Sequence, residues 1–195
     1  MTDTSSSPAS SRQVKGSVIV DYLKIMRANP DLPWGNHLSP PELQALDQMI
    51  LPASWYPAEL FQRLGVAIFK LVSREKYEVV RLFGRGMAEK MAGENPGLVV
   101  AGQPRDTLKK FMAIQARLYS PRLVEEAEAG AGRVVILVNT RREDTGCRLL
   151  VEATAGTAKR LAELAGGREV KSELLTAVWD GADTNRLQVT WKEGG

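Results

Sequence analysis

The hydrophobic pattern of the chain changes near residue 120, and this change constrains the fold more than any other feature. Before it, apolar residues recur at steps of three and four, which is the spacing of helices that bury one face. After it, the pattern predicts two strands, a helix and two more strands: 122–130, 133–140, 147–165, 169–179 and 185–192. Helices followed by β-β-α-β-β predict an α+β domain, in which an N-terminal helical layer packs on a C-terminal four-stranded antiparallel sheet.

Start and stop signals place the helices of the N-terminal half. The first helix is expected to end at the Asn-Pro pair 29–30, because a residue before proline avoids the α region. Ser39, with Glu42 three residues later, has the spacing of a capping box that begins a short helix. Ser73 is expected to cap a further helix that runs to about Met91.

The segment ILPASWYP, residues 50–57, places two aromatic residues between two prolines. Pro52 is expected to close one helix and Pro57 to open the next, so the segment is interpreted mainly as a hinge. Trp55 is expected to be buried as a plug between the helical layer and the sheet. The alternative is a binding loop that exposes its aromatic side chains, with Tyr56 as its functional end.

Composition is typical of a globular protein. The chain has 195 residues, 44% of them hydrophobic and 25% charged. Residues 1–13, rich in Ser and Thr, are expected to be a disordered tail, and 14–195 a single α+β domain. No run of about 18 apolar residues could span a membrane, and the N-terminus lacks the apolar middle of a secretory signal. The single cysteine, Cys147, excludes an internal disulfide, so we expect a cytoplasmic protein.

Few side chains offer catalytic or metal-binding chemistry. His37 is the one histidine, which excludes a multi-histidine zinc site, and one cysteine cannot supply a thiolate cluster. Cys147 begins an apolar helix, where it could be either a small buried cysteine or a reactive thiol. No Gly-rich phosphate-binding motif is present. We therefore expect no catalytic residue, no metal, no cofactor and no enzyme activity.

Positive charge gathers in the middle of the chain. Residues 70–122 contain 11 Lys and Arg against 5 Asp and Glu, although the net charge of the whole chain is +3. A solvated helix face explains this better than nucleic-acid binding, because acidic residues interrupt the run. Nucleic-acid binding is kept as an alternative, and it would use these side chains: Arg74, Lys76, Arg81, Arg85, Lys109 and Lys110.

Three segments carry a family resemblance: VKGSV, ILPASWYPAELF and GADTNRLQVTW. Together they resemble a family of unknown function found largely in myxobacteria, over roughly residues 14–192. The C-terminal half also resembles the vinyl-four-reductase and heme-NO-binding-associated domains. The pattern of those domains is a cysteine, a Gly-Asp turn, a second cysteine and an alternating strand that ends in tryptophan. Gly181 and Trp191 match the glycine and the tryptophan of this pattern, but Ala177 and Asn185 occupy the two cysteine positions. The resemblance implies helices against a four-stranded sheet, frequently dimeric and enclosing an apolar pocket, without the metal or thiol chemistry of those cysteines.

These features favour a non-enzymatic cytoplasmic sensor or adaptor module that binds a small apolar ligand or a protein partner. Gly84 lacks a side chain and would let another helix or a ligand approach closely. The candidate ligand-binding residues are Tyr56, Trp55, Phe61, Phe69 and Gly84. The alternative is an enzyme acting on a hydrophobic small molecule, with one of three side chains as proton donor: Tyr56, Glu59 or His37.

Self-association is also expected. The helices carry more apolar stripes than one small sheet can bury, and a symmetric dimer is the commonest way to cover such a surplus. We predict a homodimer through the helices of residues 57–91, with Phe69 and Phe83 as candidate contacts.

Overall fold

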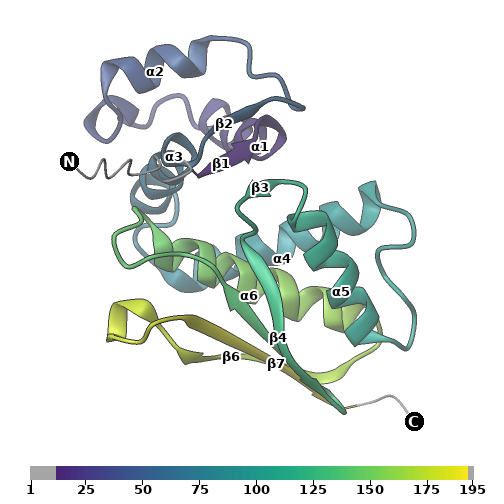
Figure 1. Ribbon diagram of the computed structural model, residues 1–195. Helices are drawn as coiled ribbons and strands as arrows, with labels where there is room; N and C mark the ends of the chain where they lie inside the picture. Colours follow the sequence, from purple (N-terminus) through teal and green to yellow (C-terminus); the bar gives the residue numbers. More distant parts are fainter. Residues whose placement is uncertain (1–11, 193–195) are drawn as a thin grey trace, which may run out of the picture.

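The computed structural model describes residues 12–192, apart from the side chains of residues 45 and 46. Helices and antiparallel strands form an α+β fold, as predicted (Figure 1). None of the described helices is long and apolar enough to cross a membrane. The elements in chain order are β1 (Gln13–Lys15), α1 (Gly16–Arg27), α2 (Pro40–Asp47), β2 (Trp55–Pro57), α3 (Ala58–Leu71), α4 (Tyr77–Glu94), α5 (Pro104–Gln115), β3 (Tyr119–Ser120), β4 (Val124–Gly130), β5 (Arg133–Val138), α6 (Cys147–Leu164), β6 (Arg168–Thr176) and β7 (Asn185–Lys192).

The expected N-terminal tail falls mostly on residues 1–11, which lie outside the described residues. Its last two residues belong to the fold. Gln13 pairs with strands on both sides of β1, and the Arg12 guanidinium forms an ion pair with Asp144 at 2.7 Å. These contacts hold the start of β1 against the loop that follows β5, so Arg12 and Gln13 are part of the fold.

The larger sheet has the strand order β4-β5-β7-β6, and all its pairings are antiparallel. The apolar strand β5 lies inside the sheet, where both neighbours cover its backbone groups. Along β7 every second residue is buried, which is the alternation of a strand with one face on the core. Helix α6 packs on this sheet and also contacts α4, so the core of the C-terminal half lies between the sheet and these helices (Figure 1).

A small second sheet has the strand order β2-β1-β3, and the sequence did not predict it. Its strand β1 precedes α1, β2 precedes α3, and β3 follows α5. Within β2 the side chain of Tyr56 points inward while Trp55 is 40% exposed, so the predicted buried plug is wrong. The reason is strand geometry, because neighbouring residues face opposite sides. The Lys15 ammonium lies 4.1 Å from the centre of the Trp55 ring. The Tyr56 hydroxyl accepts a hydrogen bond from the Leu51 N–H at 2.9 Å, which folds the loop back on itself.

The helix boundaries agree with the predicted signals except at the end of α2 and the start of α4. The expected stop at Pro52 is wrong, because α2 ends at Asp47, where the backbone of Gln48 becomes extended. The Glu42 carboxylate accepts hydrogen bonds from the Ser39 N–H (2.6 Å) and Oγ (2.7 Å), which confirms the capping box. Ser73, however, does not begin α4, which starts at Tyr77. Residues 74–75 both have positive φ, so the backbone turns there before the helix can start.

Two hydrophobic cores result from this arrangement. One lies under the sheet and includes α4, α5 and α6, whereas the other joins α1, α3 and the loop around Trp34. Figure 1 shows the second group, in purple and blue, standing above the rest of the molecule. The candidate site lies between these two cores.

Candidate functional site

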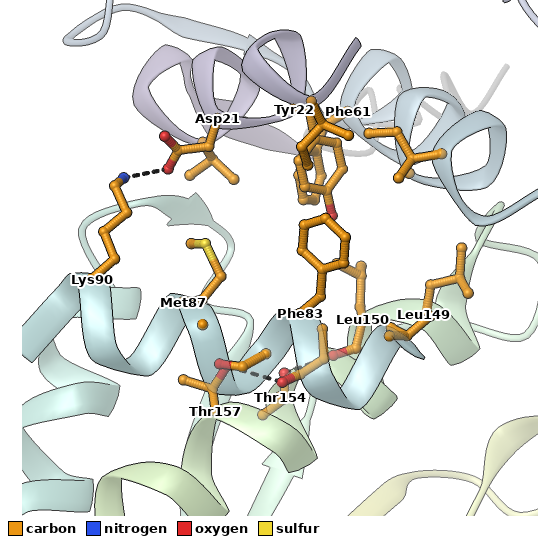
Figure 2. A pocket seen from close by; sticks show the side chains of 18 of the residues that line it. Asp21, Tyr22, Phe61, Phe83, Met87, Lys90, Leu149, Leu150, Thr154 and Thr157 are labelled. Atoms are coloured by element: carbon orange, nitrogen blue, oxygen red, sulfur yellow. Dashed lines mark hydrogen bonds and ion pairs between the residues drawn. The ribbon is translucent and has the colours of Figure 1, made fainter. Parts of the chain in front are cut away.

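A cavity of about 610 Å³ lies between the two cores. Helices α1 and α3 form one wall and helices α4 and α6 the other (Figure 2). The end of α5 and Tyr119 of β3 contribute to the same lining. Segments that are far apart in the sequence therefore meet at one site, which no local motif could reveal.

Aromatic and aliphatic side chains make most of this lining. The rings of Tyr22 and Phe61 lie 4.7 Å apart, and Tyr119 meets Phe61 edge-on at 6.0 Å. Phe83 and Met87 project from α4 toward them across the cavity (Figure 2). Stacked and edge-on rings at these distances hold one another in place. The cavity therefore has a fixed aromatic wall on one side and a flexible methionine on the other.

Two phenolic hydroxyls are the notable polar groups of the lining. Burial raises the pKa of Tyr22 to about 12. Burial also raises the pKa of Tyr119, and the neighbouring Tyr22 adds to that shift. Both phenols are therefore uncharged hydrogen-bond donors at any physiological pH.

The threonine hydroxyls of the opposite wall are already used. Thr154 Oγ1 donates to the Leu150 carbonyl oxygen at 2.7 Å. Thr157 Oγ1 lies 2.9 Å from the carbonyl oxygens of both Gly84 and Ala153, so it bridges α6 and α4. Thr157 thus stabilises the helix pair, and neither hydroxyl offers a free donor to the cavity.

Charged residues occur at one edge of the cavity, where they pair with one another. The Lys90 ammonium lies 2.6 Å from Asp21 and 3.6 Å from Glu94. Lys24 also pairs with Asp21, at 3.2 Å. Burial alone would lower the pKa of Lys90, but the hydrogen bond and charge of Asp21 outweigh it and raise that pKa. The ion pair joins α4 to α1 across the two cores (Figure 2).

The structure brings only some of the predicted ligand-binding residues together. Phe61, Phe69 and Gly84 line the cavity, whereas Tyr56 and Trp55 lie in the small sheet away from it. At Gly84 the close neighbour is a helix, because an added Cβ would lie 2.1 Å from the Ala153 carbonyl oxygen of α6. Both predicted dimer contacts also line the cavity of the single chain: Phe69 and Phe83.

Sequence reasoning missed the two tyrosines as site residues. Tyr22 lies on the apolar stripe of α1 with Val18, Ile25 and Met26, and this spacing gives no reason to separate it from them. Tyr119 follows α5 in a two-residue strand that has no pattern of its own. A search for polar-tipped aromatic residues on apolar helix faces would have found Tyr22 but not Tyr119.

The residues considered for catalysis do not form a reactive group. His37 and Glu59 are exposed, and neither lines the cavity. Cys147 is buried, and burial raises the pKa of its thiol; nearby Asp144 adds to the rise, although the Arg148 N–H opposes it. Within residues 12–192 no group of three His, Cys, Asp or Glu side chains could hold a metal ion.

Part of the basic region is neutralised inside the fold. Arg81 pairs with Glu152 at 2.6 Å and Arg85 with Glu163 at 3.0 Å. Lys110 donates to the Gly97 carbonyl oxygen at 2.7 Å. Ion pairs of this kind leave less free positive charge for a nucleic-acid backbone than the sequence count implies.

Comparison with known proteins identifies the fold. No protein-family model matches the chain, and no curated protein matches its sequence. A structure from work on heme distortion in the H-NOX family aligns with a TM-score of 0.61 at 12% identity, over 93% of this chain and 96% of that one. An oxygen-binding H-NOX domain related to soluble guanylate cyclases aligns with a TM-score of 0.59 at 14% identity, over 92% and 95%.

A mutant of the T. tengcongensis H-NOX gives a TM-score of 0.60 at 13% identity, over 92% of this chain and 98% of that one. The chain therefore has the fold of H-NOX domains. The sequence resemblance points to heme-NO-binding-associated domains, whereas the structural comparison shows the fold of the H-NOX domains. No sequence comparison supports the myxobacterial family.

The neighbours raise the question of heme, and the residues of this cavity do not fit it. Heme iron is held in proteins by His, Cys, Met or Tyr side chains. His37 and Cys147 are not among the lining residues. The two lining tyrosines are kept protonated by burial, and a methionine thioether usually ligates opposite a histidine. Heme propionates would require free cations, but Asp21 already occupies the lysines at the edge of the cavity.

Proposed function

We propose that this chain is a non-catalytic sensor module, whose ligand is a small apolar molecule other than heme. The observation that carries the proposal is the cavity of about 610 Å³ with its mostly apolar lining. Its volume falls within the range of about 300–1,000 Å³ that small-molecule sites occupy. The H-NOX fold supports a ligand-binding role in general, and the mostly apolar lining supports an apolar ligand instead of an iron porphyrin.

The position of the cavity suggests how binding would be transmitted. A ligand there touches α1 and α3 of one core and α4 and α6 of the other. Filling the space changes the relative stability of arrangements in which these cores lie closer or farther apart. We propose that the chain acts in the cytoplasm and as a homodimer. The ILPASWYP motif supports the further proposal that it belongs to the myxobacterial family.

A neutral fluorescent probe tests the proposal. N-phenyl-1-naphthylamine is apolar and emits strongly only when it leaves water, so its titration into purified protein measures occupancy of an apolar cavity. We expect saturable binding of one probe per chain. The variant Met87→Trp places a larger side chain in the cavity and should abolish this binding, since Met87 belongs to the lining.

A matched variant separates blockage from a general effect of the substitution. Met49 is 84% exposed and lies outside the cavity, so Met49→Trp should bind the probe as the wild type does. Equal binding by all three proteins would place the probe elsewhere and contradict the proposal, as would the absence of saturable binding in the wild type.

A further inference from the structure

The two phenolic hydroxyls of the cavity have no hydrogen-bond partner among residues 12–192. No hydrogen bond from Tyr22 or Tyr119 to another described residue is present, whereas Tyr56 has one. Among the described residues, Arg12 Nε is the one fully buried side-chain nitrogen or oxygen atom without a partner. The two hydroxyl oxygens are therefore not sealed in the core but reach open volume. Figure 2 shows the Tyr22 hydroxyl pointing away from α1 into the cavity, toward Phe83.

The Phe61 ring holds the rings of both tyrosines in place. Phe61 contacts both tyrosine rings, at 4.7 Å and 6.0 Å between ring centres. Tyr22 comes from α1 and Tyr119 from β3, and both residues line the same cavity. Tyr22 lies close enough to Tyr119 to add to the rise in the Tyr119 pKa. A bound acceptor oxygen would give these donors the hydrogen-bond partner that the described residues do not supply.

The charges around the cavity exclude one class of ligand. Lys24 and Lys90 are the lysines in the lining, and Asp21 pairs with both. An anionic ligand would have to displace Asp21 to find a cation. Because both phenols are protonated donors, the ligand needs an acceptor rather than a charge.

We infer that the ligand of this cavity is a neutral apolar molecule with a carbonyl-type oxygen, to which the Tyr22 and Tyr119 hydroxyls both donate. A carbonyl oxygen has two lone pairs and accepts two such bonds. The rest of the molecule lies against Phe61, Phe83 and Met87. This inference rests on the proposed function, since it assigns a ligand class to the same cavity.

Two flat probes of nearly equal shape test it. Fluorenone carries a carbonyl oxygen where fluorene carries a methylene group, and both are neutral. We expect both to bind the wild type. In the double variant Tyr22→Phe with Tyr119→Phe, fluorenone affinity should fall about tenfold, as the loss of two neutral hydrogen bonds predicts. Fluorene affinity should change less than about twofold, because the rings that it contacts remain.

A spectroscopic readout and a matched variant accompany the affinities. The carbonyl stretching frequency of bound fluorenone should be lower in the wild type than in the double variant, because hydrogen bonds weaken the C=O bond. Tyr77 stacks on Phe69 at 4.8 Å but does not line the cavity, so Tyr77→Phe should leave both probes unaffected.

The outcomes separate the inference from the function on which it rests. If both probes bind and fluorenone is insensitive to the double variant, the inference is overturned while the proposed function stands. If neither probe binds saturably to the wild type or the variants, the proposed function fails and the inference fails with it. Binding of fluorene also reports that each variant has kept a folded cavity.

Discussion

Gly84 of α4 lies so close to Ala153 of α6 that a Cβ at Gly84 would stand 2.1 Å from the Ala153 carbonyl oxygen. A second contact, from α6 to α4, is equally close: a Cβ at Gly156 would lie 2.1 Å from the Arg81 carbonyl oxygen. Backbones can approach this closely only where side chains are absent. This helix pair forms the wall of the cavity opposite α1 and α3, so the glycines help to set the cavity's shape (Figure 2).

Replacement of Gly84 should destabilise the protein despite the better helix propensity of alanine. We expect Gly84→Ala to lower the free energy of unfolding by about 1–3 kcal/mol, because α4 and α6 must move apart. Gly93, in the same helix, has no atom within 4 Å of an added Cβ. Gly93→Ala should therefore raise the free energy by up to about 1 kcal/mol. Urea denaturation measures both, and equal effects would mean that the helices are not in close contact.

The buried phenol of Tyr22 makes stability depend on alkaline pH. Its pKa is raised from 10.0 to about 12 in the folded protein. The unfolded chain therefore releases this proton first, so the stabilisation is complete below pH 10 and is lost as the pH rises toward 12. Relative to Tyr22→Phe, the wild type should lose about 2 kcal/mol of unfolding free energy at a pH near 12.

Urea denaturation at a series of pH values checks this dependence. Tyr22→Phe should show a shallower alkaline decline than the wild type, while Tyr119 keeps part of the slope in both proteins. Parallel declines would show that Tyr22 ionises as readily in the folded protein as in the unfolded chain.

The small sheet predicts different roles for two adjacent aromatic residues. Trp55 is 40% exposed, so Trp55→Ala should cost about 1 kcal/mol or less. The Tyr56 ring packs against Gly16 and the second core, and Tyr56→Ala should cost about 2–3 kcal/mol. Thermal or urea unfolding of the two variants compares them directly. A larger loss at Trp55 than at Tyr56 would reverse the assignment of inward and outward faces.

The sequence predicts the C-terminal half of this fold well, because its signals are long. The strands β4 to β7 and the helix α6 each carry a pattern over six or more residues, and all five elements occur where the pattern predicts them. The capping box at Ser39 is equally local, since its whole geometry lies within four residues. Features of this kind depend on residues that are close together in the sequence, so they can be predicted without the tertiary structure.

The features that escape prediction depend on distant contacts. The strands β1, β2 and β3 have two or three residues each, too few for an alternation pattern. Trp55 was assigned to the core by residue type, although the side of the strand that it occupies is set by pairing with Lys15. The cavity is formed by helices of both cores, so it cannot be predicted from any one segment. Phe61 and Phe69 were found because large apolar residues tend to line such sites, whereas Tyr119 had no local signal.

The proposed homodimer remains to be tested. Leu82 on α4 is 62% exposed and lies within residues 57–91, so it is a position at which the predicted interface can be tested. We expect light scattering at micromolar concentration to give twice the mass of one chain, and Leu82→Glu to shift the protein toward the monomer. A mass near 21.4 kDa for the wild type would contradict a stable dimer.

Native mass spectrometry of protein purified from its own host tests the central claim most directly, because it weighs whatever the cavity retains. The account predicts one small neutral organic molecule per chain, lost in Met87→Trp and retained in Met49→Trp, with no Soret absorption in the same sample. A bound heme with a Soret band, in proportion to the protein, would contradict the account.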